Sequence, residues 1–457
     1  MILKGPICDF VSGYIKENPV RMHMPGHKGR FFMGCEERDI TEVSGGDCLY
    51  QAEGIIAESE ARATEIFGFG RTLYSTEGSS HCIRAMIALA LSLYKKRNHG
   101  AGLQKPVIFA ARNVHRAFLS ACALLDVQIR WLIPEEAVSS LCSMSLAPES
   151  LRRALAAEKQ KPFGVYVTSP DYLGHCQDIA ALGEICKAFD VPLLVDNAHG
   201  AYLKFLQPSR HPVDLGASMS CDSAHKTLPV LTGGAYLQIS SHFSSLITKQ
   251  QAKNALALFG STSPSYLVLQ SLDLCNAYLK EDYPKRLSLF CEKIQALKNG
   301  LAQLGYDIYQ SDPLRVVISG KKRGYRGEQL GELLRKKGVE CEFCDVDALV
   351  LMLTCENRPE ELELIREILG KAAEKEPLPS FSFSFKQPVQ KISVREALFS
   401  ETERIPVEDA VGRICGAPVI SCPPAIPIAL CGEMITEEML PLFDAYNIDT
   451  IDVLTEN

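Results

Sequence analysis

Hydrophobic and polar residues follow two different periods between residues 60 and 240. Short apolar runs predict strands, and apolar positions at helical spacing predict helices. The strands are expected at 106–110, 164–169 and 191–195, and the helices at 83–94 and 179–189. This alternation is typical of βαβ units and of a mostly parallel sheet that is covered on both faces. Ligands of such sheets bind beyond the carboxyl ends of the strands, where we expect the functional site.

The pattern changes after residue 265. One long helix is expected over 265–301, followed by a small α+β region that contains both strands and helices. In that region the pattern predicts helices over 327–337 and 359–373 and a strand over 348–354. The sequence therefore predicts a second structural region that follows the large α/β region.

A linker separates these regions from the carboxyl-terminal part. Residues 374–380 are charged and contain two prolines. Phenylalanines at 381, 383 and 385 recur with a period of two, which favours a strand with one buried face over an aromatic binding platform. The proline-rich segment 422–427 predicts a turn or loop. We therefore expect a large α/β domain over 1–280, a small α+β domain over 281–375 and a third domain over 376–457.

The composition excludes several classes of function. The chain has 457 residues, 46% of them hydrophobic, and a formal net charge of −7, so no basic surface for nucleic acid or an anionic membrane is expected. No apolar run reaches the roughly 18 residues of a membrane span, and the first residues lack the order of a signal peptide. A cytoplasmic location is expected.

The 17 cysteines are scattered through apolar segments, which favours buried, reduced thiols over a disulfide framework. Cys341 and Cys344 form the one close pair. Their surroundings predict a strand, in which residues three apart face opposite sides, so neither a redox nor a metal function is expected for them. His23 and His27 have helical metal-ligand spacing, but Pro25 and Gly26 between them predict a turn, and no metal site is expected.

A lysine and an aspartate indicate the chemistry. Asp196 closes the apolar run that begins at residue 191, and Lys226 lies downstream between small residues. A pyridoxal phosphate enzyme needs a lysine amine for the Schiff base and a carboxylate that keeps the pyridine nitrogen protonated. Alone, the aspartate is more typical of a helix N-cap and the lysine of the surface. The segment 221–237 is too apolar for an exposed loop, however, so the pKa of Lys226 is expected to be lowered.

A phosphate site is predicted at Gly78, Ser79 and Ser80. A glycine and two hydroxyls precede a helix there, and the start of a helix offers free N–H groups to an anion. The alternative is an ordinary helix-capping turn. His115 follows a predicted strand and could stack on the pyridine ring or cap a helix. Ser169 also follows a strand, and it could reach the phenolic oxygen of the cofactor or only begin the turn at Pro170.

Ordered motifs along nearly the whole chain resemble the ornithine/lysine/arginine decarboxylase family of fold-type I pyridoxal phosphate enzymes, in its short form. They are His23-Met-Pro-Gly-His-Lys-Gly29, Asp39-Ile-Thr-Glu42, Gly78-Ser-Ser80, Arg112-Asn-Val-His115, Thr168-Ser-Pro170, Asp196-Asn-Ala-His-Gly200, Ser223-Ala-His-Lys-Thr-Leu228, Ser261-Thr-Ser-Pro-Ser-Tyr266, Pro423-Pro-Ala-Ile-Pro427 and Gly432-Glu433. This resemblance implies a large cofactor domain, a small α+β domain and a carboxyl-terminal decarboxylase-family domain.

The resemblance also implies roles for individual residues. Lys226 would carry the cofactor, Asp196 would pair with the pyridine nitrogen, and Ala198 and His115 would lie on the two ring faces. The remaining cofactor contacts would come from Gly78, Ser79, Ser80, Ser169, His199, Ser223 and His225. Ser261, Thr262 and Ser263 would reach the phosphate of a neighbouring subunit, which makes a homodimer, or a higher oligomer, the expected active form.

Several positions depart from the pattern of the family. Asn197 stands where an acidic residue is usual, and Tyr202 where a histidine is common. Glu77 and His81 flank the phosphate loop where small polar residues are more usual, while Arg116 and Ala425 replace lysine and glycine. These departures leave the cofactor machinery in place, but they affect positions that also shape the substrate pocket.

The expected activity is decarboxylation of a basic L-amino acid, namely arginine, lysine or ornithine, to an amine of polyamine biosynthesis and carbon dioxide. Lys226 or His225 would return a proton to Cα, and Asp47 or Glu433 would meet the cationic end of the substrate. The alternatives are another fold-type I activity, an aminotransferase or a carbon–carbon lyase, and a non-catalytic homologue.

Overall fold

The computed structural model describes residues 4–98, 105–136, 140–141, 144–379, 382–384, 386–417 and 428–456. The chain forms two compact units, each made of two segments. One unit contains Met1–Gly102 and Pro192–Leu287, and the other contains Leu103–Val191 and Ser288–Asn457. These units cut across the predicted domains 1–280, 281–375 and 376–457, which stay a prediction.

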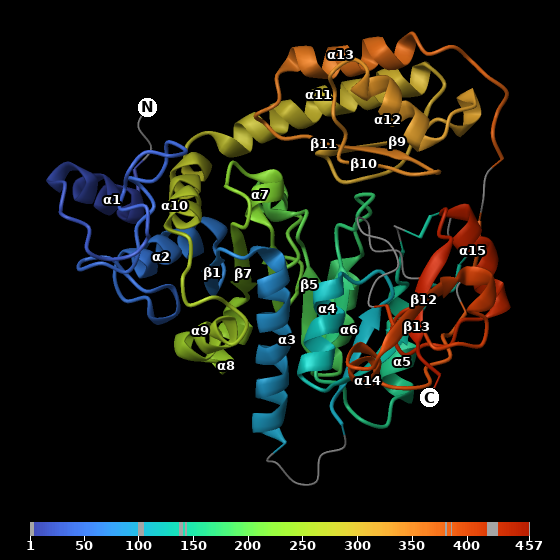
Figure 1. Ribbon diagram of the computed structural model, residues 1–457, viewed down its shortest axis with the longest axis horizontal. Helices are drawn as coiled ribbons and strands as arrows, with labels where there is room; N and C mark the ends of the chain where they lie inside the picture. The colour runs from blue at the N-terminus through green and yellow to red at the C-terminus, as the bar shows by residue number, and fades with distance from the viewer. Residues whose placement is uncertain are drawn as a thin grey trace. The chain divides into compact units, whose positions relative to one another are not determined.

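Four strands of the first unit lie in the order β1-β7-β6-β5. They are β1 (Arg71–Ser75), β7 (Ala235–Ile239), β6 (Met219–Asp222) and β5 (Leu193–Asp196). The β5–β6 pair is parallel, and it places Asp196 opposite Cys221. Helix α3 (Gly78–Arg97) packs on β6 and β7 (Figure 1). All four strands are buried almost throughout, as expected for a sheet covered on both faces.

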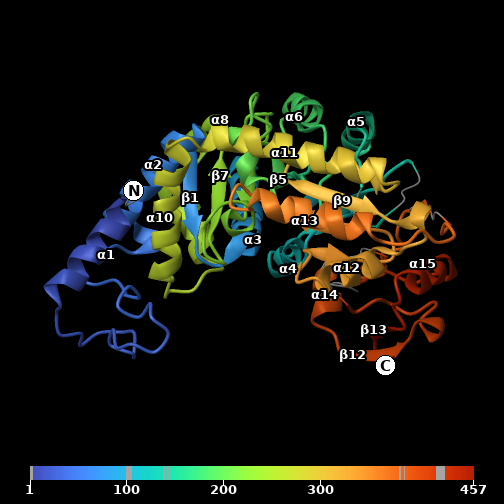
Figure 2. The same ribbon diagram turned by 90° about the horizontal axis from the view of Figure 1, so that it is seen from above.

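Helices α1 (Pro6–Glu17), α2 (Ile55–Phe67) and α10 (Tyr266–Lys280) pack together in the same unit (Figure 2). Buried Asp273 of α10 satisfies the first turn of α1, because its Oδ2 accepts the N–H groups of Ile7 and Cys8 at 3.0 Å. The other elements of this unit are short. They are η1 (Leu49–Gln51), η2 (Ala201–Phe205), α7 (Ala224–Thr227), α8 (Ser241–Leu246) and α9 (Lys249–Ala257).

The single long helix predicted over 265–301 is wrong. The chain forms two helices, α10 and α11 (Tyr283–Gln303), with a break at Glu281, whose ψ of −119° is not helical. Pro284 explains the break, because proline lacks an N–H and is tolerated only in the first turn of a helix. The sequence thus contained the signal for the break.

In the second unit, β4 (Val165–Thr168), β2 (Val107–Ala111) and β3 (Gln128–Leu132) form a parallel arrangement in that order. Helices α4 (Arg116–Leu124), α5 (Pro148–Ala157) and α6 (Ile179–Ala188) belong to the same unit. The strands and helices predicted from the hydrophobic pattern are present here within one or two residues. The predicted α/β class with a mostly parallel sheet is confirmed.

A separate antiparallel sheet has the order β10-β11-β9-β8. Its strands are β10 (Phe343–Cys344), β11 (Leu349–Met352), β9 (Arg315–Ser319) and β8 (Asp307–Ile308). The segment η3 (Lys321–Arg323) is a 3-10 helix. Helix α12 (Gly327–Arg335) packs on β10 and β11, and α13 (Pro359–Gly370) packs on α12 (Figure 1). This is the predicted α+β region.

The orientation predicted for Cys341 and Cys344 is wrong. Strand β10 contains only Phe343 and Cys344, and the chain bends at Glu342, so the alternation of a strand does not extend to Cys341. Both sulfur atoms lie beside Gly331 of α12, because a Cβ built there would be 2.9 Å from Cys344 Sγ and 3.5 Å from Cys341 Sγ. The two thiols therefore share one side of the strand.

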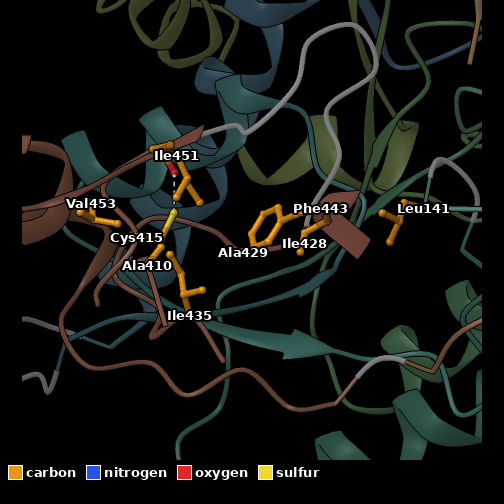
Figure 3. Packing of buried hydrophobic residues seen from close by; sticks show 10 residues of the cluster. Leu141, Ala410, Cys415, Ile428, Ala429, Ile435, Phe443, Ile451 and Val453 are labelled. Carbon is orange, nitrogen blue, oxygen red and sulfur yellow. Dashed lines mark hydrogen bonds between the residues drawn. The ribbon is translucent and has the colours of Figure 1, made fainter. Parts of the chain in front are cut away.

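The carboxyl-terminal part contains α14 (Val394–Leu398), η4 (Val407–Asp409), η5 (Glu437–Met439), α15 (Leu440–Ala445) and the antiparallel pair β12 (Thr402–Pro406) and β13 (Thr450–Leu454). Its core gathers Phe443, Cys415 and Val453 (Figure 3). Leu141 joins this core, and its N–H donates to Tyr446 Oη at 3.0 Å. The predicted proline-rich loop 422–427, with Ala425, and the phenylalanines at 381 and 385 lie outside the described residues.

Candidate active site

Lys226 lies on α7, a single helical turn that follows the end of β6. Its Nζ is 3.0 Å from Nε2 of His199, which is itself buried. Lys226 is partly buried, so its amine is shielded from bulk water without being sealed off. The predicted lowering of its pKa stays a prediction.

Asp196 ends strand β5 and is 3% exposed. Its Oδ1 accepts the N–H of Ala198 at 3.2 Å and the thiol of Cys221 at 3.5 Å. The parallel pairing of β5 with β6 produces the second contact, because it places Cys221 directly opposite Asp196. These contacts fix the carboxylate at the carboxyl end of the strand, where ligands of parallel sheets bind.

A buried polar network lies behind Asp196. Asn197 donates its Nδ2–H to Oδ1 of Asp222 at 2.8 Å, and His211 and Gln238 contact Oδ2 of Asp222, both at 3.0 Å. An amide at position 197 supplies a donor to this carboxylate, whereas a second carboxylate would repel it. The departure at Asn197 is therefore matched to its surroundings in this chain.

Helix α3 begins at Gly78, whose φ of +74° favours glycine. The Gly78 N–H donates to Gly233 O at 2.7 Å, and a Cβ built on Gly78 would have no atom within 4 Å, so space lies beside the start of the helix. The hydroxyl of Ser223 donates to Ser79 Oγ at 2.8 Å. Ser80 follows in the first helical turn, where N–H groups have no intrahelical acceptor. These groups can hold a phosphate.

His225 precedes Lys226, and its Nδ1 donates to Gly234 O at 3.0 Å. Burial lowers the pKa of His225, and the nearby charge of Lys226 lowers it further against the opposing effect of the Gly234 carbonyl. The ring is thus neutral at pH 7, with Nε2 as its acceptor.

Ser261, Thr262 and Ser263 are exposed and follow α9. Glu77 contacts this segment, because its Oε1 accepts the N–H of Ser261 at 2.6 Å. His81 contacts the preceding segment through Nε2 and Leu256 O, which are 2.6 Å apart. The two residues that depart from the family pattern beside the phosphate loop therefore fix the path of the chain into residues 261–263.

His115 and Ser169 belong to the second unit and have local partners there. His115 caps α4, and its Nδ1 accepts the N–H of Ala117 at 3.1 Å. The Oγ of Ser169 accepts the N–H of Gln177 at 3.1 Å, and Ser169 is 3% exposed. The helix-capping alternative for His115 is therefore present in the structure, while the contacts of His115 and Ser169 with a cofactor stay predictions.

Asp47 has a structural role, and its predicted contact with substrate stays a prediction. Its two carboxylate oxygens accept five backbone N–H groups at 2.9–3.2 Å, including those of Ile56 and Ala57 in the first turn of α2. The carboxylate thereby satisfies N–H groups that lack intrahelical acceptors. The sequence does not indicate that Asp47 caps α2, because η1 and a loop separate Asp47 from the start of that helix.

Glu433 forms a buried ion pair with Arg112. It has no exposed surface, and both of its oxygens bind the guanidinium of Arg112, with Nη2 2.6 Å from Oε2. The Leu430 N–H also donates to Oε2, at 2.9 Å. A buried carboxylate with these partners neutralises an arginine, which is a structural role. The predicted contact of Glu433 with substrate stays a prediction.

His23 and His27 lie in a turn, as predicted, in which the Lys28 N–H donates to Pro25 O. His23 Nε2 lies 2.5 Å from Tyr14 Oη, and His27 Nε2 lies 3.2 Å from Asp39 Oδ2. Within the described residues, no group of three or more histidine, cysteine or acidic side chains is arranged to hold a metal ion. Within the same residues, no helix combines the length and apolarity that a membrane crossing requires.

Two domain models of one known protein family match most of the chain. The major domain of the Orn/Lys/Arg decarboxylases matches residues 5–304, and the carboxyl-terminal domain of the same family matches residues 382–447. The chain belongs to the Orn/Lys/Arg decarboxylase family. It is therefore a decarboxylase, as the sequence motifs predicted.

Two bacterial relatives show how far the likeness extends. The arginine decarboxylase of Halalkalibacterium halodurans is 29% identical over 95% of this chain and 92% of its own length. The arginine decarboxylase of Bacillus subtilis is 27% identical over 95% of this chain and 91% of its own length. The likeness to these relatives thus extends over nearly the whole chain.

Solved structures confirm the fold. The structure of the Francisella novicida lysine decarboxylase superimposes on 99% of this chain, over 81% of the length of that enzyme. The TM-score is 0.80 and the sequence identity is 15%. The constitutive lysine decarboxylase of E. coli covers 99% and 82% with a TM-score of 0.78 at 17% identity. Both are fold-type I enzymes, and at this identity the likeness establishes the fold of the chain.

The family implies pyridoxal phosphate, and the first unit contains groups that fit it. Lys226 offers an amine, Asp196 a fixed carboxylate, and the start of α3 open space beside hydroxyl and N–H donors. An aldehyde, a pyridine nitrogen and a phosphate require these three kinds of group. The donor set of this chain is therefore suited to the cofactor.

Proposed function

We propose that this protein is a pyridoxal phosphate-dependent decarboxylase of a basic L-amino acid (arginine, lysine or ornithine) that releases the amine and carbon dioxide. The observation that carries the proposal is the presence of Lys226, Asp196 and the open start of α3 within one compact unit. The arginine decarboxylases at 27–29% identity support a basic substrate.

Each residue of the site has a defined task in this proposal. The Lys226 amine holds the cofactor aldehyde, and Asp196 keeps the pyridine nitrogen protonated. When bound, pyridoxal phosphate supplies a ring that accepts the electrons of the broken Cα–carboxylate bond. Gly78, Ser79, Ser80 and Ser223 hold its phosphate.

A proton must return to Cα after carbon dioxide leaves. Lys226 and the adjacent His225 are the candidates for this step. His225 is neutral at pH 7, because burial lowers its pKa, and the bond from Nδ1 to Gly234 O orients the ring. A neutral ring accepts a hydrogen bond through Nε2, so His225 can orient a water molecule or the Lys226 amine for the transfer.

Two buried arginines are already paired within the chain, so neither is a candidate for the carboxylate clamp of the aminotransferase alternative. Aminotransferases clamp the α-carboxylate of their substrate with an arginine. Here Arg112 binds Glu433, and Arg315 lies 3.3 Å from Asp312 and donates to Tyr172 O at 2.8 Å. Both guanidinium groups are thus occupied by groups of the chain itself.

The proposal extends to the assembly of the enzyme. We propose a homodimer, or a higher oligomer built from it, in which the exposed Ser261, Thr262 and Ser263 contact the phosphate of the neighbouring subunit. We further propose that the enzyme acts in the cytoplasm on a small-molecule amino acid, without nucleic acid or membrane, and supplies polyamine biosynthesis. Sedimentation of the wild type beside a Ser261→Glu variant tests the shared site.

The activity is tested by incubating the purified protein and pyridoxal phosphate with arginine, lysine and ornithine separately. Amine and carbon dioxide are measured, with Lys226→Ala as the control. We expect one of the three substrates to be turned over by the wild type alone. A keto-acid product would identify an aminotransferase, and the absence of turnover on all three would refute the basic-substrate proposal.

A further inference from the structure

Cys341 and Cys344 converge at the edge of the small antiparallel sheet. Strand β10, which contains Cys344, is the outer strand of this sheet, and within the described residues it pairs with β11. Both sulfur atoms face Gly331 of α12, at 3.5 Å and 2.9 Å from a Cβ built on that glycine. Any larger residue at position 331 would displace the Cys344 sulfur, so the absence of a side chain there makes room for the pair.

The two thiols interact directly. Burial raises the pKa of Cys344, the charge of the neighbouring Cys341 thiol and a hydrogen bond with it act in the same direction, and the pKa reaches about 11. The guanidinium of Arg335, at the end of α12, acts in the opposite direction. Both cysteines are partly exposed, so a small molecule can reach them.

The residues between the two cysteines contact the loop that carries Ser169. Tyr172 Oη donates to Oε1 of Glu342 at 3.1 Å, and the Tyr172 and Phe343 rings meet edge to face at 5.3 Å. The Tyr172 carbonyl is in turn bound by Arg315. These contacts offer a direct path by which a movement of β10 would reach Tyr172.

We propose that Cys341 and Cys344 form a reversible redox pair that is oxidised by low-molecular-weight disulfides and that its state is transmitted to the Tyr172 loop. The Cys341 thiolate attacks the external disulfide and releases one thiol. The Cys344 thiolate then attacks the sulfur of Cys341 in the mixed disulfide and releases the second thiol, so the two protein protons leave with the two products. The external disulfide is reduced and the protein dithiol is oxidised.

Closing the pair must shift β10. A disulfide needs an S–S bond of about 2.05 Å, which is shorter than the separation of two hydrogen-bonded thiols by roughly 1.5–2 Å. Glu342 and Phe343 lie between the bonded residues, so they take up this contraction. Because β10 is an edge strand of two residues, the shift breaks little of the sheet.

The pair is tested on the full-length protein with oxidised and reduced glutathione. Free thiols are alkylated, and disulfides are then reduced and labelled with a second reagent. Peptides are mapped by mass spectrometry, and fragment ions distinguish labels on Cys341 and Cys344 from a label on Cys355, which lies nearby in the sequence. We expect Cys341 and Cys344 to acquire the second label together and to lose it after reduction. Continued alkylation of both by the first reagent, or a persistent mixed disulfide at Cys341, would overturn the proposal.

Two variants sharpen this test. Cys344→Ser should stop at a mixed disulfide on Cys341, because the resolving thiol is absent. Gly331→Ala retains both thiols but moves one sulfur, so we expect closure to slow by about tenfold, as alignment of the reacting atoms is lost. Closure of Gly331→Ala at the wild-type rate would show that Gly331 does not set the geometry of the pair.

Transmission to Tyr172 is measured by hydrogen exchange over residues 169–175, in the oxidised and reduced protein. We expect oxidation to change exchange in this loop, and the change to shrink in Tyr172→Phe, which lacks the hydroxyl that binds Glu342. Equal exchange in both states would refute transmission, whether or not the disulfide forms. These measurements need no turnover, so their failure is distinct from failure of the proposed activity.

Discussion

Arg112 and Glu433 form a buried ion pair between positions 321 residues apart in the chain. Their side chains are 2% and 0% exposed. Arg112 directly follows β2, and Glu433 lies in the carboxyl-terminal part, so the pair fixes that part to the α/β region of the second unit. Removing one partner would leave an uncompensated charge in the interior.

We expect Arg112→Ala to lower the free energy of unfolding by about 3–5 kcal/mol, because breaking a buried pair leaves Glu433 unpaired. Urea unfolding, followed by circular dichroism, measures the change. Arg366→Ala is the matched control: it removes an exposed pair with Glu363 and should cost less than about 1 kcal/mol. Equal effects of the two substitutions would contradict the buried pairing.

Asp47→Ala tests the structural role of Asp47. We expect a loss of about 2 kcal/mol in stability, because the backbone N–H groups at the start of α2 lose their acceptor. The ratio of kcat/KM for arginine to that for lysine should not change. A change in this ratio at unaltered stability would instead support the contact with substrate that the sequence predicted.

Asp345→Asn tests a buried carboxyl. Burial raises the pKa of Asp345 to about 6 from its usual 3.8, so the folded protein binds this proton more tightly than the unfolded chain does. The stability from this group is therefore fully present below pH 3.8 and is lost as pH rises through 6. We expect Asp345→Asn to be more stable than the wild type by about 2–3 kcal/mol at pH 7 and by much less at pH 4.

Urea unfolding at both pH values measures this difference. The side-chain oxygen of asparagine can still accept the Asp347 and Ala348 N–H groups that Asp345 now accepts, so the turn is retained. Glu136→Gln, at an exposed position, is the control for the removal of one charge. An Asp345→Asn variant that is destabilised at pH 7 would show that the carboxylate is the favoured form.

Asp196→Asn tests the electrostatic partner of the cofactor. We expect kcat to fall by about 10²–10³-fold, the cost of losing one preorganised electrostatic group, while the fold is retained. The absorbance of the bound cofactor should shift as the pyridine nitrogen loses its proton. Wild-type activity with an unchanged spectrum would exclude Asp196 as the partner of that nitrogen.

Local signals predicted much of the fold. The apolar runs placed β2, β4 and β5 within two residues, because a parallel strand buried on both faces is nearly all apolar. The same runs identified Asp196 at a strand end. The break between α10 and α11 was missed, because the prediction relied on the helical period of the apolar residues and did not use the signal of Pro284.

Long-range contacts could not be predicted in the same way. Arg112 and Glu433 are 321 residues apart in the chain, and no local sequence pattern indicates that they pair. Asp47 has an ordinary loop sequence around it, and only the folded path brings α2 to its carboxylate. The position of Cys341 was missed because a bend at Glu342 interrupts the strand alternation on which the prediction depended.

Borohydride reduction of the protein loaded with pyridoxal phosphate, followed by peptide mapping, identifies the amine that carries the cofactor. We predict a pyridoxyl label on Lys226 in the wild type, and none at position 226 in a Lys226→Ala variant. A wild-type protein that decarboxylates its substrate but carries the label on another lysine, or none on Lys226, would contradict the proposed chemistry.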